Sequence, residues 1–146
     1  MAKLYYQGHG SFRLTSQNGT VLYVDPYAGD GYLLPADYIL VTHEHGDHNQ
    51  ISLVTAKPDC QVIRAANAMQ NGNYQTFSLE DGITVQAVPA CNQNHKREEC
   101  VGYVITIDGT AVYAAGDTSA TPEMSSLLAP MHLDYALLPT DGHYNM

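Results

Sequence analysis

Residues 38–48, Tyr-Ile-Leu-Val-Thr-His-Glu-His-Gly-Asp-His, are the most informative part of this sequence about its fold. Its first four residues are apolar, which is typical of a strand buried on both faces. His43, His45, Asp47 and His48 follow directly, and imidazole and carboxylate groups are ligands for zinc and also for iron or manganese. In extended backbone His43 and His45 point to the same side, whereas the adjacent Asp47 and His48 suit a second centre or the turn into a helix. The pattern favours a metal site at a strand end over a surface turn in which Asp47 only caps a helix.

Length and charge limit the possible classes of protein. With 146 residues and no internal break, residues 1–146 are expected to form one domain. The 15 acidic residues outnumber the 6 basic ones, and the net charge of −9 argues against a nucleic-acid partner and an anionic membrane. No stretch reaches the length of a transmembrane helix and the first residues lack a signal-peptide core, so a cytoplasmic location is expected. Three sparse cysteines, Cys60, Cys91 and Cys100, are expected to be free thiols.

Many short strands and a few helices are expected along the chain. Strands are predicted over residues 4–6, 11–15, 20–24, 38–41, 61–64, 74–79, 83–88, 101–107, 110–115 and 135–138. Helices are predicted over residues 51–56, 65–70 and 122–128. The helices are interspersed rather than strictly alternating with strands, which favours a mixed-sheet, layered α/β fold.

Several segments resemble one known family. Residues 41–48 resemble the H-x-H-x-D-H signature of the metallo-β-lactamase superfamily. Residues 8–12 resemble the G-H-x-S-F opening of its lactonase-like and uncharacterised metal-dependent hydrolase branch, and residues 24–26, 115–118 and 136–146 resemble later segments of that branch in the same order. The resemblance implies an αββα sandwich, in which mixed β-sheets are flanked by helices.

The resemblance also implies roles for five residues. His43 and His45 would bind a first metal, Asp47 and His48 a second, and Asp117 would bridge the two metals. Without the resemblance, the less favoured alternative for Asp117 is a turn residue before a helix.

The third ligand of the first metal has more than one candidate. The family places a histidine after a strand ending in Val-Pro-Ala, and an ungapped alignment puts Asn92 there. His95, three residues later, is the better ligand chemically and is favoured, with Asn92 as its hydrogen-bond partner. Cys91 is a softer alternative that ranks below both.

The end of the chain departs from the family pattern. The family completes its second metal with a histidine beyond residue 146, so we expect a fragment or a shortened member whose last strand and helix are missing. The second metal would then be weak, absent or completed by another chain, and exposed apolar sheet surface would favour a homo-oligomer. His143 either lines the pocket or is solvated, His132 is expected to be structural, and His9 either reaches the site or is a hydrogen-bonded loop residue.

The predicted activity is metal-dependent hydrolysis. One or two ions, most simply Zn²⁺ with Mn²⁺ or iron as alternatives, would activate water toward a small ester, lactone or phosphoester. Asp47 would act as the catalytic residue that orients the water and takes up its proton, while Glu44 is expected to face solvent. A metal-binding module without turnover and a di-iron redox protein of the same fold are the alternatives.

Overall fold

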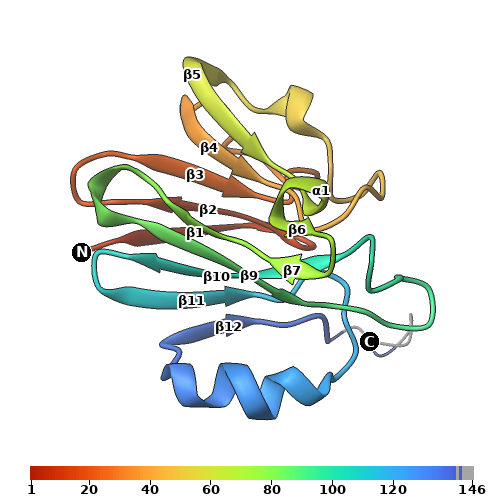
Figure 1. The fold of residues 1–146 in the computed structure, drawn as a ribbon. Coiled ribbons are helices and arrows are strands. Elements are labelled where there is room, and N and C mark those ends of the chain that lie inside the picture. Colours follow the sequence, from red (N-terminus) through yellow and green to blue (C-terminus); the bar gives the residue numbers. More distant parts are fainter. Residues whose placement is uncertain (141, 143–146) are drawn as a thin grey trace.

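Two five-stranded sheets stacked face to face form the protein in this computed structural model, which describes residues 1–140 and 142 (Figure 1). The first sheet contains, in order, β1 (Lys3–Gly8), β2 (Ser11–Thr15), β3 (Val21–Val24), β4 (Ala36–Leu40) and β5 (Ala56–Ile63). The second contains, in order, β12 (Tyr135–Leu137), β11 (Thr110–Ala114), β10 (Val101–Ile107), β9 (Thr84–Pro89) and β8 (Thr76–Ser78). The β3–β4, β4–β5 and β11–β12 pairs are parallel and the other pairs are antiparallel, so the expected mixed-sheet α/β fold is confirmed.

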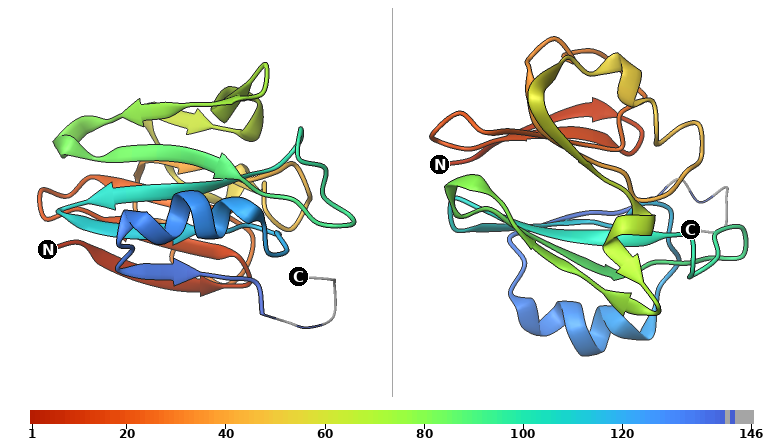
Figure 2. Two further views of the ribbon diagram at one scale, coloured as in Figure 1. Left: turned by 60° about the horizontal axis from the view of Figure 1, so that its bottom comes forward. Right: turned by 45° about the horizontal axis from the view of Figure 1, so that its top comes forward.

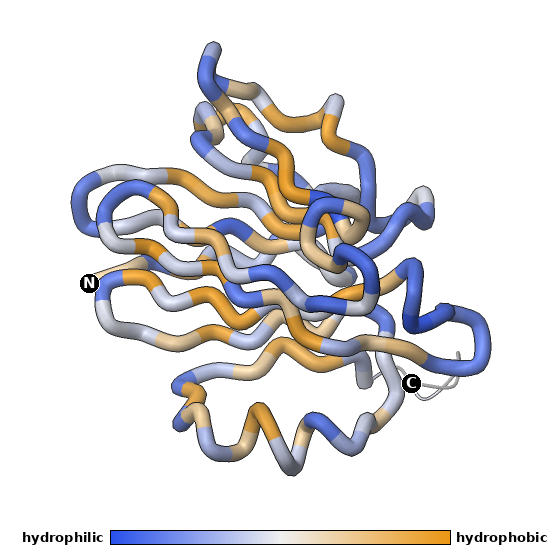
Figure 3. Tube along the Cα trace, viewed as in Figure 1, coloured by the Kyte–Doolittle hydropathy of each residue, from blue (hydrophilic) through white to orange (hydrophobic). Residues whose placement is uncertain are grey.

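The main core lies between the two sheets and follows the two-residue period of the strands. In β4, Tyr38 and Leu40 point into this core, whereas Ile39 and the following Val41 pack on the outer face. This arrangement explains the unbroken apolar run at residues 38–41, because β4 is covered on both faces. Figure 3 shows hydrophobic residues concentrated along the strands of both sheets.

The outer faces of the two sheets are covered differently. A helical segment over residues 122–131 packs across the second sheet through Leu128, and it contains a π-helical stretch η3 (Met124–Leu128) and a 3-10 turn η4 (Ala129–Met131) (Figure 2). On the first sheet, Tyr32 and the short 3-10 turn η1 (Ile51–Leu53) form the cover instead of a longer helix.

Two of the predicted helices are wrong in extent. The helix expected over residues 51–56 is only the turn η1, and β5 begins at Ala56 and continues through Pro58. Because β5 is the edge strand of its sheet, the missing N–H of proline costs no ladder hydrogen bond on the open side.

The helix expected over residues 65–70 is a single turn, α1 (Ala65–Ala68). The chain then forms the hairpin of β6 (Met69–Gln70) and β7 (Asn73–Tyr74). Asn71 and Gly72 both have positive φ, at 52° and 78°, and they close this two-residue turn.

The last strand, β12, lies at the open edge of the second sheet. Here Tyr135 is 61% exposed, and Leu138, directly after the strand, is 52% exposed. No helix among the described residues is both long and apolar enough to cross a membrane.

The carboxyl ends of β3, β4, β9 and β11 meet at one end of the sandwich (Figure 1). Two contacts join the sheets there: Tyr103 Oη donates to the carbonyl of Val41 at 3.0 Å, and the N–H of Val101 donates to the carbonyl of Thr42 at 3.0 Å. Since the residues that follow these strands include the predicted ligands, the fold gathers them at one place.

Candidate metal centre

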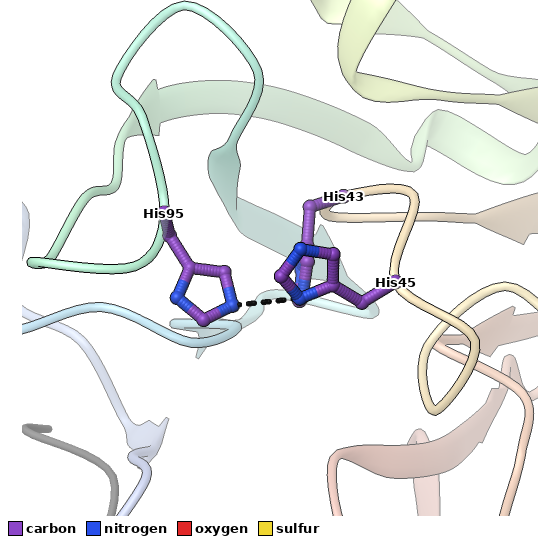
Figure 4. Close-up of side chains that lie close together, drawn as sticks. All are labelled: His43, His45 and His95. Carbon is purple, nitrogen blue, oxygen red and sulfur yellow. Dashed lines mark hydrogen bonds between the residues drawn. The ribbon is translucent and has the colours of Figure 1, made fainter.

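Three histidines from both sheets converge at this end of the molecule. His43 and His45 follow β4 in the first sheet, and His95 lies in the loop between β9 and β10 of the second. Their ligand nitrogens all lie within 4.8 Å of one another, and Nε2 of His95 is 3.0 Å from Nδ1 of His45 (Figure 4). Nitrogens at such distances can share one metal ion, so these residues form a candidate first metal position.

The hydrogen bonds of His43 determine which of its nitrogens is free. The hydroxyl of Thr42 donates to Asp25 Oδ2 at 2.6 Å, so it accepts a proton from Nδ1 of His43, 2.9 Å away. Nε2 of His43 then carries the lone pair, and it is buried without any hydrogen-bond partner. An unpartnered imidazole nitrogen inside a protein needs an explanation, and a metal ion supplies one.

His48 repeats this arrangement on the other side of the cluster. Its Nδ1 lies 2.8 Å from Oδ2 of Asp25, and its buried Nε2 has no hydrogen bond of good geometry. Orientation of a ligating histidine by a carboxylate at the opposite ring nitrogen is a recurrent feature of metal sites. The residues present therefore fit a metal ion.

The structure separates the roles of the candidates in the β9–β10 loop. Nδ1 of His95 lies 2.7 Å from Oδ1 of Asn92, which directs Nε2 of His95 toward the cluster. Asn92 contacts the ring nitrogen of His95 that faces away from the cluster, and its amide donates to the carbonyl of Asp117 at 3.2 Å. Cys91 belongs to no candidate ligand group among the described residues, and all three cysteines are free thiols, as expected. The geometry favours His95 as the ligand and Asn92 as its support.

Asp117 lies between the two sets of histidines. Its Oδ1 is 3.2 Å from Nε2 of His48, and its Oδ2 is 3.5 Å from Nε2 of His95 and 3.8 Å from Nε2 of His43. Gly116, with φ of +62°, lets the chain pass close to Thr42, because a Cβ at this position would be 2.8 Å from the Thr42 hydroxyl oxygen. Each oxygen of the carboxylate thus faces a different candidate position.

Asp47 occupies the more open side of the centre. Its side chain is 41% exposed, and Oδ2 lies 3.1 Å from Nε2 of His9 in the β1–β2 turn. Asp47, His48 and His9 form a second group whose ligand atoms lie within 4.8 Å of one another. We call Asp47 and His48, the two members of this group predicted as ligands from the sequence, the candidate second metal position.

Burial and neighbouring charge set the protonation of the cluster. Burial, followed by the nearby positive charge of His48, lowers the pKa of His43 to about 3. Burial opposes the charged form of His48, but the neighbouring carboxylates of Asp117 and Asp25 outweigh this and raise its pKa to about 10. Burial likewise opposes ionisation of Asp117, yet the neighbouring His48 keeps the pKa of this carboxyl below its usual range. A carboxylate anion therefore lies beside the neutral imidazole of His43, and a cation that binds Nε2 of His48 would replace a ring proton there.

Two supporting residues, Asp25 and Thr42, were not identified as functional from sequence. The carboxylate of Asp25 accepts hydrogen bonds from the backbone N–H and hydroxyl of Thr42 as well as contacting His48. Asp25 is 1% exposed and has φ of 45°, an uncommon value for a residue other than glycine. A charged residue directly after the buried strand β3 was the available signal, because a buried carboxylate needs partners.

The remaining candidates lie away from the cluster or outside the described residues. Glu44 is exposed and pairs with Arg64 at 2.7 Å, as expected for an outward-facing residue. His132 is exposed and ends the turn η4 with φ of 50°. His143 lies outside the described residues.

Comparisons with known proteins identify a matching family and several similar hydrolases. Residues 3–146 match the family model described as Beta-lactamase superfamily domain. A metal-dependent hydrolase of Thermococcus onnurineus is 31% identical over 172 residues, which cover 100% of this chain and 75% of the relative. The crystal structure of a candidate metal-dependent hydrolase from Parabacteroides distasonis is 32% identical with a TM-score of 0.78, covering 100% of this chain and 78% of the other. A metallo hydrolase from Ignicoccus hospitalis is 26% identical with a TM-score of 0.74, covering 99% and 73%.

Proposed function

Because this chain belongs to the beta-lactamase superfamily domain family and is a metal-dependent hydrolase, we propose that it hydrolyses small, uncharged esters or lactones. His43, His45 and His95 would hold a first cation. Asp47 and His48 would hold a second, and Asp117 would contact both. Imidazole and carboxylate ligands suit Zn²⁺ best, and Mn²⁺ or iron are the alternatives.

A divalent cation at this position would polarise a substrate carbonyl and lower the pKa of a water molecule. The chain's own residues then have two tasks. Thr42, Asp25 and Asn92 fix the rings of the histidines in one orientation through the hydrogen bonds described above. Asp47, half-exposed and next to the open side, would orient the attacking water and take up its proton at a carboxylate oxygen.

The charge around the neighbouring cavity supports an uncharged substrate. This cavity is lined by the histidines of the first position and by Glu44, Glu98 and Glu99. The basic residues close to it are already paired: Arg64 with Glu44 at 2.7 Å and Lys96 with Glu99 at 3.3 Å.

Arg97 is similarly occupied by Glu123. Among the described residues lining the cavity, no free cation is available to hold a phosphate or carboxylate group of a substrate. A neutral ester or lactone avoids the repulsion that the acidic lining would impose on an anion.

The observation that carries this proposal is the pair of buried, unpartnered Nε2 atoms of His43 and His48 facing Asp117. The test is zinc content by elemental analysis together with hydrolysis of matched neutral lactones, carboxylate esters and phosphodiesters. We expect His45→Ala to lose zinc from the first position and all activity, and Asp117→Asn to weaken the second zinc more than the first.

The exposed His132 provides the matched control, and His132→Ala should keep zinc and activity. Full activity in His45→Ala would overturn the assignment. Zinc binding without turnover of any substrate in the panel would instead identify a metal-binding module, and iron in the purified protein would favour redox chemistry.

A further inference from the structure

We propose that His9 is a ligand of the second metal position, where it acts together with Asp47 and His48. The proposal rests on the proposed function, because it extends the same centre to the turn between β1 and β2. The sequence left His9 undecided between a site residue and a hydrogen-bonded loop histidine.

The distances place His9 within reach of a shared ion. Nε2 of His9 is 3.1 Å from Oδ2 of Asp47, and the ligand atoms of His9, Asp47 and His48 lie within 4.8 Å of one another. Ligands about 2.0–2.1 Å from a tetrahedral zinc ion lie about 3.3 Å apart, and the 3.1 Å separation of His9 and Asp47 is close to this value. The rings of His9 and His48 meet edge to face, with centroids 5.2 Å apart.

The backbone of the turn is built to bring this imidazole to the centre. His9 has φ of 53°, a left-handed conformation that is uncommon for residues other than glycine. Its carbonyl accepts a hydrogen bond from the hydroxyl of Tyr6 at 3.0 Å, which holds the turn in place. Strained residues of this kind are concentrated at binding and active sites.

Gly10 gives the turn its close approach. A Cβ on Gly10 would lie 2.8 Å from Cε1 of His48, so the absence of a side chain lets the β1–β2 turn pack directly on that ligand. His9 also lines a cavity together with Asp117, and none of the residues lining this cavity lines the cavity of the first position.

The test is a calorimetric titration of the metal-free protein with Zn²⁺, with elemental analysis of the dialysed product. We expect two zinc ions in the unmodified protein. His9→Asn keeps a residue that tolerates the left-handed conformation but shortens the side chain. We expect it to weaken the second zinc by more than the roughly 10–100-fold typical of losing a supporting hydrogen bond, with the first zinc unchanged.

Two further variants make the result specific. His132→Asn replaces an exposed histidine with nearly the same φ, 50°, and should bind both ions normally. His9→Gln retains an N–H that can reach Asp47, so restoration of the second zinc by glutamine would overturn the ligand role and leave only a positioning role.

The remaining outcomes separate this inference from the proposed function. The inference about His9 would be overturned if His9→Asn bound two zinc ions with unchanged affinity. It would also be overturned if the unmodified protein bound a single zinc, and in both cases the assignment of the first position would stand. Absence of zinc from the unmodified protein, or unchanged binding in His45→Ala, would overturn the proposed function itself.

Discussion

Nδ1 of His48 lies 2.8 Å from Oδ2 of Asp25, and both side chains are only 1% exposed. This contact fixes the ring and leaves Nε2 of His48 facing Asp117. We expect Asp25→Asn to weaken zinc at the second position about 10–100-fold, because an amide is a poorer partner for the ring N–H than a carboxylate. Competition with a chromogenic chelator measures the change. Asp59→Asn, an exposed aspartate on β5, is the control, and equal affinities in the two variants would contradict the prediction.

The roles of His95 and Asn92 in the β9–β10 loop can be distinguished by replacing each with alanine. His95→Ala should lose the first zinc, because it removes a ligand nitrogen from the cluster. Asn92→Ala should lower zinc affinity by only about 10–100-fold, because it removes the acceptor for Nδ1 of His95 but leaves the ring in place. Elemental analysis after dialysis against a graded series of free zinc distinguishes the two. If Asn92→Ala were the more damaging change, the assignment of the third ligand would be reversed.

Gly10→Ala tests the close packing of the β1–β2 turn on His48. The added Cβ would come within 2.8 Å of the His48 ring, which must move, so we expect weaker zinc binding and a large loss of hydrolysis. Gly46→Ala is the same substitution and lies between the candidate ligands His45 and Asp47, but its Cβ would meet only Gln50 Nε2 at 3.9 Å. It should behave like the unmodified protein. Equal behaviour of the two variants in zinc titration and lactone hydrolysis would refute the steric argument.

Asp81 gives a prediction about stability and pH, independent of the metal centre. This exposed carboxylate in the 3-10 turn η2 (Glu80–Gly82) accepts hydrogen bonds from Thr20, Asn18 and Ser16 in the β2–β3 hairpin. The bonds from Thr20 and Asn18 lower its pKa below the ordinary value of 3.8.

The pKa of Asp81 is lower in the folded protein than in the unfolded chain, so the ionised carboxylate stabilises the fold. This stabilisation is fully present above about pH 3.8, and it is lost as the pH falls through the pKa of Asp81 in the folded protein. Asp81→Asn should therefore be less stable than the unmodified protein in urea unfolding at pH 7, with the difference shrinking toward pH 3. A difference that stayed constant between these pH values would show that the carboxylate charge is not responsible. Asp59→Asn again provides a control without such partners.

The parts of the fold that the sequence predicted well are those set by local pattern. The two-residue alternation predicted most strands within one or two residues of their observed bounds, including β10 and β11. The helix over residues 51–56 failed because the pairing of β5 with β4 overrides local propensity. Sequence pattern contains no information on such long-range pairing.

In the candidate site, too, the sequence predicted the residues that form a local pattern and missed those that depend on long-range contacts. His43, His45 and His48 stand out from sequence because three imidazoles occur within six residues. The choice between His95 and Asn92 depended on the conformation of the loop between β9 and β10, which spacing alone does not define. Asp25 was missed because its role exists only once β3 and β4 lie side by side and bring its carboxylate to Thr42 and His48.

The ligands come from both halves of the sandwich: His43, His45 and His48 from the first sheet, His95 and Asp117 from the second. A cation held between them would act as a cross-link that clamps the two layers at one end. Its removal should then loosen this end first, so that a protease would cut the loop over residues 91–100 faster in the presence of a chelator. Catalytic capacity and resistance to degradation would be controlled by the same ion, and the lifetime of the protein would follow the supply of metal.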